Sequence, residues 1–408
     1  MNDQEMERSY IEENTGEPGP RRSRKNYDYL SVESCFVAFV FFTVLSQIIL
    51  YAVSGTISKP FRPLIILILT VMVVRRGRLK LSVCTTAFVM SVYVMLIWFF
   101  YYPKGGSLHG YLITVLYFMM LFSVASFPWN RRELQLIIYA TFLATIVLAV
   151  VFCSSNNMLD FTGYTYFNFW GQTVNRNKNA YAFALGLILG WQYLSFGKGR
   201  NRKLIILGML LEGYCLIYSQ CRGAFIGAFA AICVVVLIKA FNMYRSGNPY
   251  LLIYLLTFIF VCILGYVLIK NSPVSRLVDG DNLSGRDEGM KHATQLFKEA
   301  PFLGKIFGNG TNYEAEHTVG IGVHFVYLKY LLEVGLVGSG MIVLIFLQSM
   351  KYLRGTIPWS LLILAFSKTL FEGMDYYVFI PLILALCISN YERLYHHPGN
   401  ELYWRERY

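Results

Sequence analysis

Cationic side chains stand beside apolar stretches of the sequence, where they could bind an anion at the edge of a membrane. Arg176 and Lys178 alternate with asparagines just before one apolar run. Arg222 separates two further runs, and Arg286 lies in a later polar segment. A guanidinium group presents fork-shaped donors and stays charged, which suits the phosphates of a lipid diphosphate headgroup. Each cation alone could instead snorkel to the interface or pair with a carboxylate, so the predicted anion site depends on their convergence.

A histidine begins another apolar run and could act as a base. His324 opens a stretch that also contains Gly335 and Gly338. An imidazole there can accept a proton from a hydroxyl group near neutral pH. Alternatively, the His324 side chain could cap a helix or bind water. The glycines would let two helices approach closely. His317 is the only other histidine nearby, which is too little for a metal site, so neither a metal nor a cofactor is predicted.

The composition indicates that lipid surrounds the elements that position these residues. Of the 408 residues, 56% are hydrophobic and 15% charged, whereas soluble domains have about 25% charged residues. The net charge of +12 is attributed to membrane topology, not to binding of nucleic acid. The cysteines lie in or beside apolar runs without a Cys-x-x-Cys pair, so they predict neither a disulfide framework nor a zinc site. They are Cys35, Cys84, Cys153, Cys215, Cys221, Cys233, Cys262 and Cys387.

The apolar runs predict an all-α, polytopic transmembrane bundle. A bilayer requires about 20 apolar residues per helix, and the sequence has about twelve such runs, some of them short. The last two could also form one broken hairpin. The runs are 36–53, 60–74, 82–101, 111–127, 134–153, 180–196, 204–218, 224–241, 250–269, 323–347, 358–370 and 376–389.

Positive charge predicts the orientation of the bundle. Lys and Arg are concentrated in alternate short connections, and such connections face the cytoplasm. Both termini are therefore expected to be cytoplasmic. The sequence divides into a cytoplasmic tail at 1–33, a transmembrane domain at 34–392 and a second cytoplasmic tail at 393–408. Two long extracytoplasmic loops, 154–179 and 270–322, interrupt the transmembrane domain.

The second of these loops is expected to carry a short amphipathic helix. Ser284 is a candidate N-cap, and Pro301 should stop the helix. Its apolar residues recur at helical spacing, which predicts a helix lying on the outer membrane interface. These residues are Met290, Ala293, Leu296 and Phe297. Gly304, Gly308 and Gly310 indicate a flexible turn region after it.

Taken in order, these segments resemble the O-antigen ligase and O-antigen polymerase family of bacterial membrane glycosyltransferases. The resemblance covers 175–338: the Asn-Arg-Asn-Lys-Asn-Ala segment from Asn175, the Ser-Gln-Cys-Arg-Gly-Ala turn from Ser219, and a loop with Ser-Gly-Arg and Ala-Pro-Phe-Leu-Gly. The spacing from His324 to Gly335 and Gly338 is similar to the family's histidine motif. The chain departs from the family where Gln220 and Cys221 separate Ser219 from Arg222, and where Phe325 replaces an asparagine.

The resemblance implies a GT-C-type, metal-independent, inverting glycosyltransferase of the bacterial inner membrane. Its donor would be an oligosaccharide on undecaprenyl diphosphate, and its partners would be membrane lipid and a chain-length regulator. Arg222 and Arg286 would stabilise the diphosphate leaving group, with Arg176 and Lys178 as further diphosphate-binding residues. His324 would act as the general base or orient the acceptor hydroxyl.

Two questions remain open at the level of sequence. A polymerase would transfer the glycan to another lipid-linked repeat unit, and a ligase would transfer it to lipid A core. We favour the polymerase because nothing in the sequence indicates a lipid A site. A transporter or flippase is the alternative from another class, since Lys329, Glu333 and Lys368 lie within apolar runs and such charges often mark transport pathways.

Overall fold

The structure is a computed structural model that describes residues 82–101, 108–127, 129, 131–156, 166–167, 173–174, 176–196, 202–271, 286–310, 326–371 and 376–395. The predicted runs 36–53 and 60–74 and the N-terminal tail lie outside these residues, as do His324, the predicted cap Ser284 and most of the C-terminal tail.

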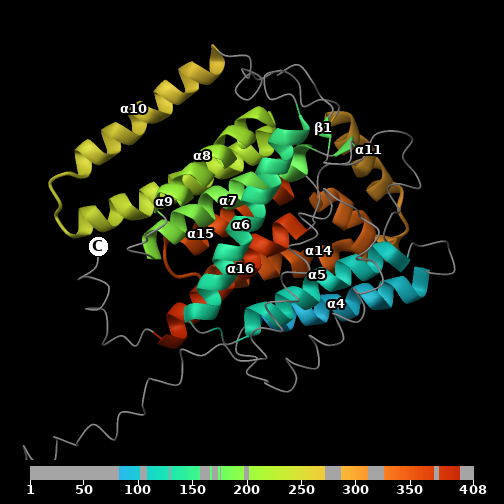
Figure 1. The fold of residues 1–408 in the computed structure, drawn as a ribbon. Helices are drawn as coiled ribbons and strands as arrows, with labels where there is room; N and C mark the ends of the chain where they lie inside the picture. The colour runs from blue at the N-terminus through green and yellow to red at the C-terminus, as the bar shows by residue number, and fades with distance from the viewer. Residues whose placement is uncertain are drawn as a thin grey trace, which may run out of the picture.

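The described chain is a helical bundle (Figure 1). Every predicted apolar run from residue 82 onward forms a helix, because a helix satisfies most backbone hydrogen bonds within the segment itself. The helices are α4 (Ser82–Tyr101), α5 (Leu108–Ser126), α6 (Arg131–Ser155), α7 (Arg176–Phe196), α8 (Arg202–Tyr218), α9 (Arg222–Arg245), α10 (Leu251–Lys270), α14 (Val326–Tyr352), α15 (Thr356–Phe371) and α16 (Tyr376–Tyr395).

The two predicted loops contribute smaller elements. In the first, β1 (Tyr166–Phe167) and β2 (Thr173–Val174) form a short antiparallel ladder. In the second, α11 (Arg286–Glu299) and α12 (Phe302–Phe307) flank Pro301, where the sequence predicted a helix end. Gly304 lies inside α12, so the predicted turn region is partly helical.

The long helices have the length and apolarity of a membrane-embedded protein. Among the described residues, 4 helices qualify as candidate spans: Ser82–Phe100, Arg132–Ser155, Arg222–Arg245 and Tyr327–Tyr352. Shorter apolar helices occur at Leu251–Val267, Thr356–Leu370 and Val378–Tyr391. This agrees with the all-helical membrane fold expected from composition.

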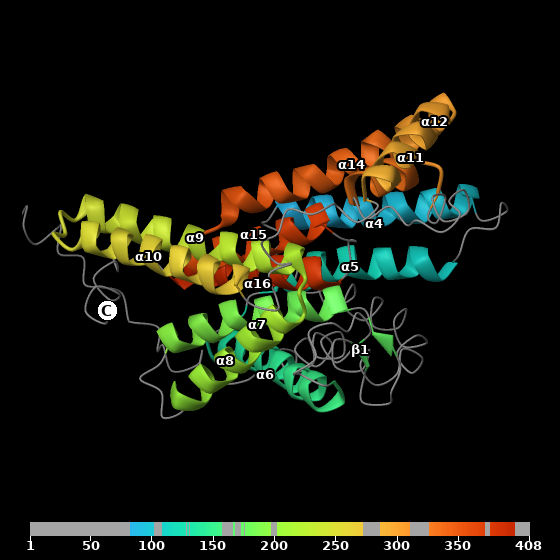
Figure 2. The same cartoon turned by 90° about the horizontal axis from the view of Figure 1, so that it is seen from above.

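The helices pack in layers (Figure 2). α6, α7 and α8 contact one another on one side, α9 and α16 pack on α15 in the middle, and α4 contacts α14 and α5 on the other side. By contrast, α10 contacts mainly α9 and stands apart from the bundle in Figure 1. Residues over most of its surface are exposed, including Leu252, Val261 and Leu264. An apolar helix that makes so few contacts with the described helices suits a lipid surrounding.

Small residues allow α9 and α15 to approach closely. Gly227 and Ala231 of α9 are buried against α15, where the Ser360 hydroxyl donates to the carbonyl oxygen of Ala231 at 3.2 Å. A Cβ added at Gly227 would overlap the Ser367 hydroxyl and lie 3.4 Å from Leu364 Cδ1. Contacts between small residues are a main source of helix association in membranes.

The Gly227→Leu variant is expected to lower the free energy of unfolding by about 1–3 kcal/mol, because a larger side chain overpacks this contact. Thermal unfolding of the detergent-purified protein measures the change. Gly265→Ala in α10 is the control, since an added Cβ there meets nothing within 4 Å. Equal melting temperatures for Gly227→Leu and the unmodified protein would contradict the packing role.

Candidate functional site

Several helix ends meet at one end of the bundle, which we call the convergent end. There α7, α9 and α14 begin and α15 ends. The last turn of α15 makes the connections: Ser367 packs on Gly227 of α9, Lys368 lies over the ring of Tyr181 in α7, and Thr369 bonds Tyr327 of α14. β1, α11 and α12 lie toward the same side of the bundle, on the right in Figure 2.

Two of the predicted cations are the first residues of helices at this end. Arg176 begins α7, with Lys178 in the same turn, and Arg222 begins α9. A cation at a helix N-terminus opposes the macrodipole, by about 0.3–1 kcal/mol for an exposed site. Locally unfavourable placements of this kind are expected at functional sites. The arrangement brings the first turns of α7 and α9 to one end, as the anion-site prediction requires.

A tight turn positions Arg222. Ser219 is buried, its hydroxyl donates to the Leu216 carbonyl oxygen at 2.6 Å, and the Cys221 amide donates to the Ser219 hydroxyl at 3.3 Å. Gln220 adopts φ 50°, a left-handed conformation rare for residues other than glycine. Arg222 itself is half-buried. The residues that depart from the family pattern, Gln220 and Cys221, therefore form the turn that ends α8 and starts α9.

For the two remaining predicted catalytic residues, Arg286 and His324, the structure gives less detail. Arg286 begins α11. The apolar face of that helix, at Ala293 and Leu296, packs on Leu332 of α14. The predicted helix therefore forms, and α14 covers this part of its apolar face. His324 lies outside the described residues, and α14 begins two residues after it.

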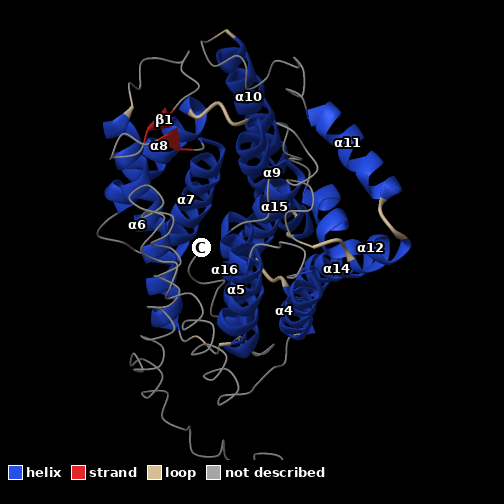
Figure 3. Cartoon of the chain, turned by 90° about the vertical axis from the view of Figure 1, so that its right-hand side faces the viewer, coloured by secondary structure: helices blue, strands red, loops and turns tan. Residues whose placement is uncertain are grey.

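A break in α14 joins this helix to the α11–α12 segment. Gly335 has φ 68° and ψ −171°, which interrupts the helical hydrogen bonds. The freed carbonyl oxygens of Leu332 and Glu333 accept hydrogen bonds from the amides of Asn309 and Gly310, at 2.9 and 3.0 Å. The Asn309 side chain also donates to Leu332, at 3.1 Å. Figure 3 shows α11 and α12 beside α14, on the side of the molecule away from α6 and α8.

This break changes the roles predicted for two groups of glycines. Gly308 and Gly310 have φ of 94° and 97° and shape the segment that caps α14, so their backbone is ordered by hydrogen bonds. Gly335 permits the break and, as predicted, also lets another helix, α12, approach closely, because an added Cβ would overlap the backbone of Ile306 and Gly308. Gly338 does serve close helix approach, because an added Cβ would lie 3.0 Å from Cε1 of Tyr93 in α4.

Lys368, which the sequence showed as a charge within an apolar run, lies at the convergent end. It lies in the last turn of α15, is 1% exposed and holds its ammonium nitrogen 4.9 Å from the centre of the Tyr181 ring. In the sequence, the polar run Ser-Lys-Thr near the end of an apolar segment was the signal that could have placed Lys368 near a helix end. The other two charges form a local ion pair in α14, with Lys329 Nζ 3.9 Å from Glu333 Oε1.

A second polar group lies apart from the convergent end. Glu212 of α8 is fully buried, and its carboxylate accepts a hydrogen bond of 2.6 Å from the Thr145 hydroxyl of α6. Gly186 of α7 leaves room for this carboxylate, because an added Cβ would overlap it. Sequence reasoning missed Glu212, although a lone glutamate inside an apolar run is a signal. The group links α6, α7 and α8.

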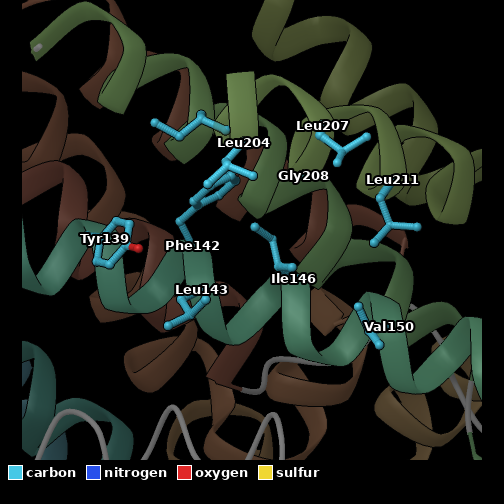
Figure 4. Close-up of a pocket in the computed structure, with 10 residues that line it drawn as sticks. Tyr139, Phe142, Leu143, Ile146, Val150, Leu204, Leu207, Gly208 and Leu211 are labelled. Atoms are coloured by element: carbon cyan, nitrogen blue, oxygen red, sulfur yellow. The ribbon is translucent and has the colours of Figure 1, made fainter. Parts of the chain in front are cut away.

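An apolar groove between α6 and α8 offers no alternative chemical site. Its volume is about 370 Å³, and Figure 4 shows its lining residues pointing toward one another from the two helices. The Tyr139 hydroxyl is the one polar side-chain group among the residues that line it, which are Tyr139, Phe142, Leu143, Ile146, Val150, Leu204, Ile205, Leu207, Gly208 and Leu211. The lining suits hydrocarbon and cannot support acid, base or anion chemistry.

No protein-family model, curated protein or solved structure matches this chain. The likeness to the glycan ligases and polymerases therefore rests on the order of the sequence motifs.

Chemically, the convergent end suits an anionic group of a membrane lipid. Helix N-termini carry partial positive charge and amide donors. α7 begins at Arg176 and α9 at Arg222, and Lys368 lies in the last turn of α15. Such a set could stabilise negative charge that develops on a phosphate during bond cleavage.

Proposed function

We propose that this protein is a polymerase of a surface polysaccharide, such as O-antigen, capsule or exopolysaccharide. It transfers a glycan from undecaprenyl diphosphate to a hydroxyl group of another lipid-linked repeat unit. The observation that carries the proposal is the meeting of α7, α9, α14 and α15, which gathers the starts of two arginine-led helices beside the start of α14. The order of the sequence motifs supports the same family.

The proposal also covers the number of membrane spans, the arrangement of the helices and the membrane in which the protein lies. The protein has about twelve spans in a GT-C-like arrangement, lies in the bacterial inner membrane and keeps both termini in the cytoplasm. The convergent end then faces the outside, where flipped lipid-linked units and a chain-length regulator are available. The positive-inside distribution of Lys and Arg supports this orientation.

The reaction is a single displacement without a metal. The acceptor hydroxyl oxygen attacks the anomeric carbon, the bond from that carbon to the diphosphate oxygen breaks, and the diphosphate leaves with the electron pair. His324 takes the hydroxyl proton, a contribution of about 10²–10⁴ in rate. Arg222 and Arg286 stabilise the departing diphosphate, and Arg176 and Lys178 bind it. Attack from the opposite face inverts the anomeric configuration.

Purified protein in proteoliposomes tests this function. Given only lipid-linked repeat units, the polymerase should produce longer chains that remain on undecaprenyl diphosphate. Product formed only after lipid A core is added would instead identify a ligase. Repeat units that stay unchanged under both conditions would contradict glycan transfer.

One observation favours a transporter as the second candidate. α14 is interrupted at Gly335, and transporters often build their sites from broken helices. A variant that combines Arg222→Ala, Arg286→Ala and His324→Ala distinguishes the two functions. If it inserts normally and still supports glycan polymerisation in cells, the transporter is favoured, because the proposed chemical groups would be dispensable.

A further inference from the structure

Two cysteines from different helices meet where α6 and α8 end. The sulfur atoms of Cys153 and Cys215 lie 3.4 Å apart, and neither residue is in a disulfide. The Cys215 sulfur also lies 3.8 Å from the carbonyl oxygen of Ala149, one turn before Cys153 in α6. The sulfur atoms of a disulfide are about 2 Å apart, so these two need to approach by only about 1.4 Å to form one.

Neighbouring contacts hold α6 and α8 in the register that pairs the two sulfur atoms. Earlier along both helices, the Thr145 hydroxyl of α6 donates to the Glu212 carboxylate of α8 at 2.6 Å. Beside the cysteines, the rings of Phe152 and Tyr218 lie 5.9 Å apart. The cysteines are 62 positions apart in the sequence, so no spacing motif indicated them. The packing of α6 on α8 alone creates the pair.

The two thiols differ in exposure, which gives each a different part in the chemistry. Cys153 is half-buried and lies two residues before the end of α6, where the polar residues Ser154, Ser155 and Asn156 follow it. Cys215 is fully buried. Redox-active cysteines are typically accessible and stand next to a second cysteine that resolves the first oxidation product. Cys153 has the position of the first, and Cys215 that of the second.

We propose that Cys153 and Cys215 are a site of reversible disulfide formation that ties the last turn of α6 to the last turn of α8. The co-reactant is a disulfide-bearing oxidant, either a small molecule such as oxidised glutathione or a protein thiol oxidase. The inference is independent of the proposed glycan transfer.

The reaction is thiol–disulfide exchange in two steps. The Cys153 thiolate attacks one sulfur of the oxidant, which breaks the oxidant's disulfide and releases its first thiol. Cys215 then loses its proton, and its sulfur attacks Cys153 Sγ and displaces the second thiol. The two cysteines lose two electrons and two protons in total, and the oxidant takes up both as two thiols.

The disulfide lies next to the turn that positions Arg222. The Cys215 carbonyl oxygen accepts a hydrogen bond of 2.9 Å from the Ser219 amide, and the Ser219 hydroxyl accepts one from the Cys221 amide. A covalent bond from Cys215 to α6 therefore anchors the start of this turn. It also closes a loop of chain that contains α7, so oxidation should stabilise this side of the bundle.

Oxidation of the detergent-purified full chain by oxidised glutathione tests the pairing. After the remaining thiols are alkylated, mass spectrometry should find the peptides of Cys153 and Cys215 joined, and dithiothreitol should separate them. Cys153→Ser should abolish this link. Cys262→Ser is the matched control, because Cys262 is also half-buried but lies in α10, which contacts mainly α9. The link should form in this control as in the unmodified protein.

Thermal unfolding provides a second measurement. Oxidation should raise the melting temperature of the unmodified protein by about 5 °C, because the cross-link restricts the unfolded chain between the two cysteines. Dithiothreitol should reverse the shift. Cys153→Ser should melt at the same temperature under oxidising and reducing conditions, and this comparison within one variant separates the effect of the bond from any effect of the substitution.

Three results would overturn the inference. One is a protein that carries glutathione on Cys153 while Cys215 stays a free thiol. Another is a link from either residue to a different cysteine, and the third is a link that forms only after the protein is unfolded. Detection of the joined peptides requires no variant, so it decides the matter even if Cys153→Ser does not fold. None of these results bears on the proposed polymerase.

Discussion

Glycan transfer by Arg222→Ala is expected to fall by about 10²–10³, the loss measured when one donor that stabilises developing negative charge is removed. Arg222 begins α9 at the convergent end and follows the tight turn at Gln220. Its guanidinium group would contact the diphosphate most strongly as the glycosidic bond breaks. The decrease should therefore appear in kcat more than in KM. Initial rates of chain elongation in proteoliposomes, measured over a range of lipid-linked repeat concentrations, test this prediction.

The same helix provides the matched control. Arg245 is the last residue of α9, is exposed and lies over the ring of Phe241. Arg245→Ala removes an equal charge from the opposite end of the helix and should leave transfer unchanged. Arg222→Lys should recover part of the rate, because lysine keeps the charge and loses the fork-shaped donor pair. Equal rates for Arg222→Ala and Arg245→Ala would remove Arg222 from the mechanism.

Gly335→Ala should be the most destabilising small substitution in α14. The residue has φ 68°, where a side chain is strained, and an added Cβ would overlap the amide nitrogen of Gly308 and the carbonyl oxygen of Ile306. Relieving this overlap must separate α12 from α14. We expect the free energy of unfolding to fall by about 3 kcal/mol or more, from backbone strain and lost hydrogen bonds together. Thermal unfolding of the purified protein measures this change.

Gly340→Ala is the control for that experiment. Gly340 lies in the same helix, and an added Cβ there meets nothing within 4 Å. Alanine favours a helix interior by about 1 kcal/mol over glycine, so this variant should be as stable as the unmodified protein or more so. A melting temperature for Gly335→Ala equal to that of Gly340→Ala would show that the break in α14 is not required.

The hydrogen bonds made at the break in α14 also link stability to the proposed chemistry. Leu332 and Glu333 accept hydrogen bonds from the segment that follows α12, while Tyr327 in the first turn of α14 contacts Thr369 at 3.0 Å. The first half of α14 is thus held at both of its ends. Because α14 starts just after His324 in the sequence, changes at Gly335 are expected to reduce glycan transfer even at temperatures where the protein remains folded.

The sequence by itself determined the class of fold and the approximate positions of the described long helices. Apolar runs such as 82–101 and 180–196 became α4 and α7, since hydrocarbon leaves a backbone no partner except itself. Pro301 marked a real helix end, because proline lacks an amide donor and disfavours the helical conformation of the residue before it. These effects depend only on neighbouring residues in the chain, so hydropathy and residue type were sufficient to predict them.

Only the tertiary structure decided which ends of those helices meet and what each charge touches. The contact between Lys368 and the Tyr181 ring was not anticipated, and Glu212 was missed, because a hydropathy run does not reveal the neighbours of a side chain. The close approach at Gly335 was anticipated but the break in α14 was not, since the donors that stabilise the break, Asn309 and Gly310, lie in another segment of the chain. Such contacts join residues far apart in the chain, and their geometry is set by how the helices pack against one another.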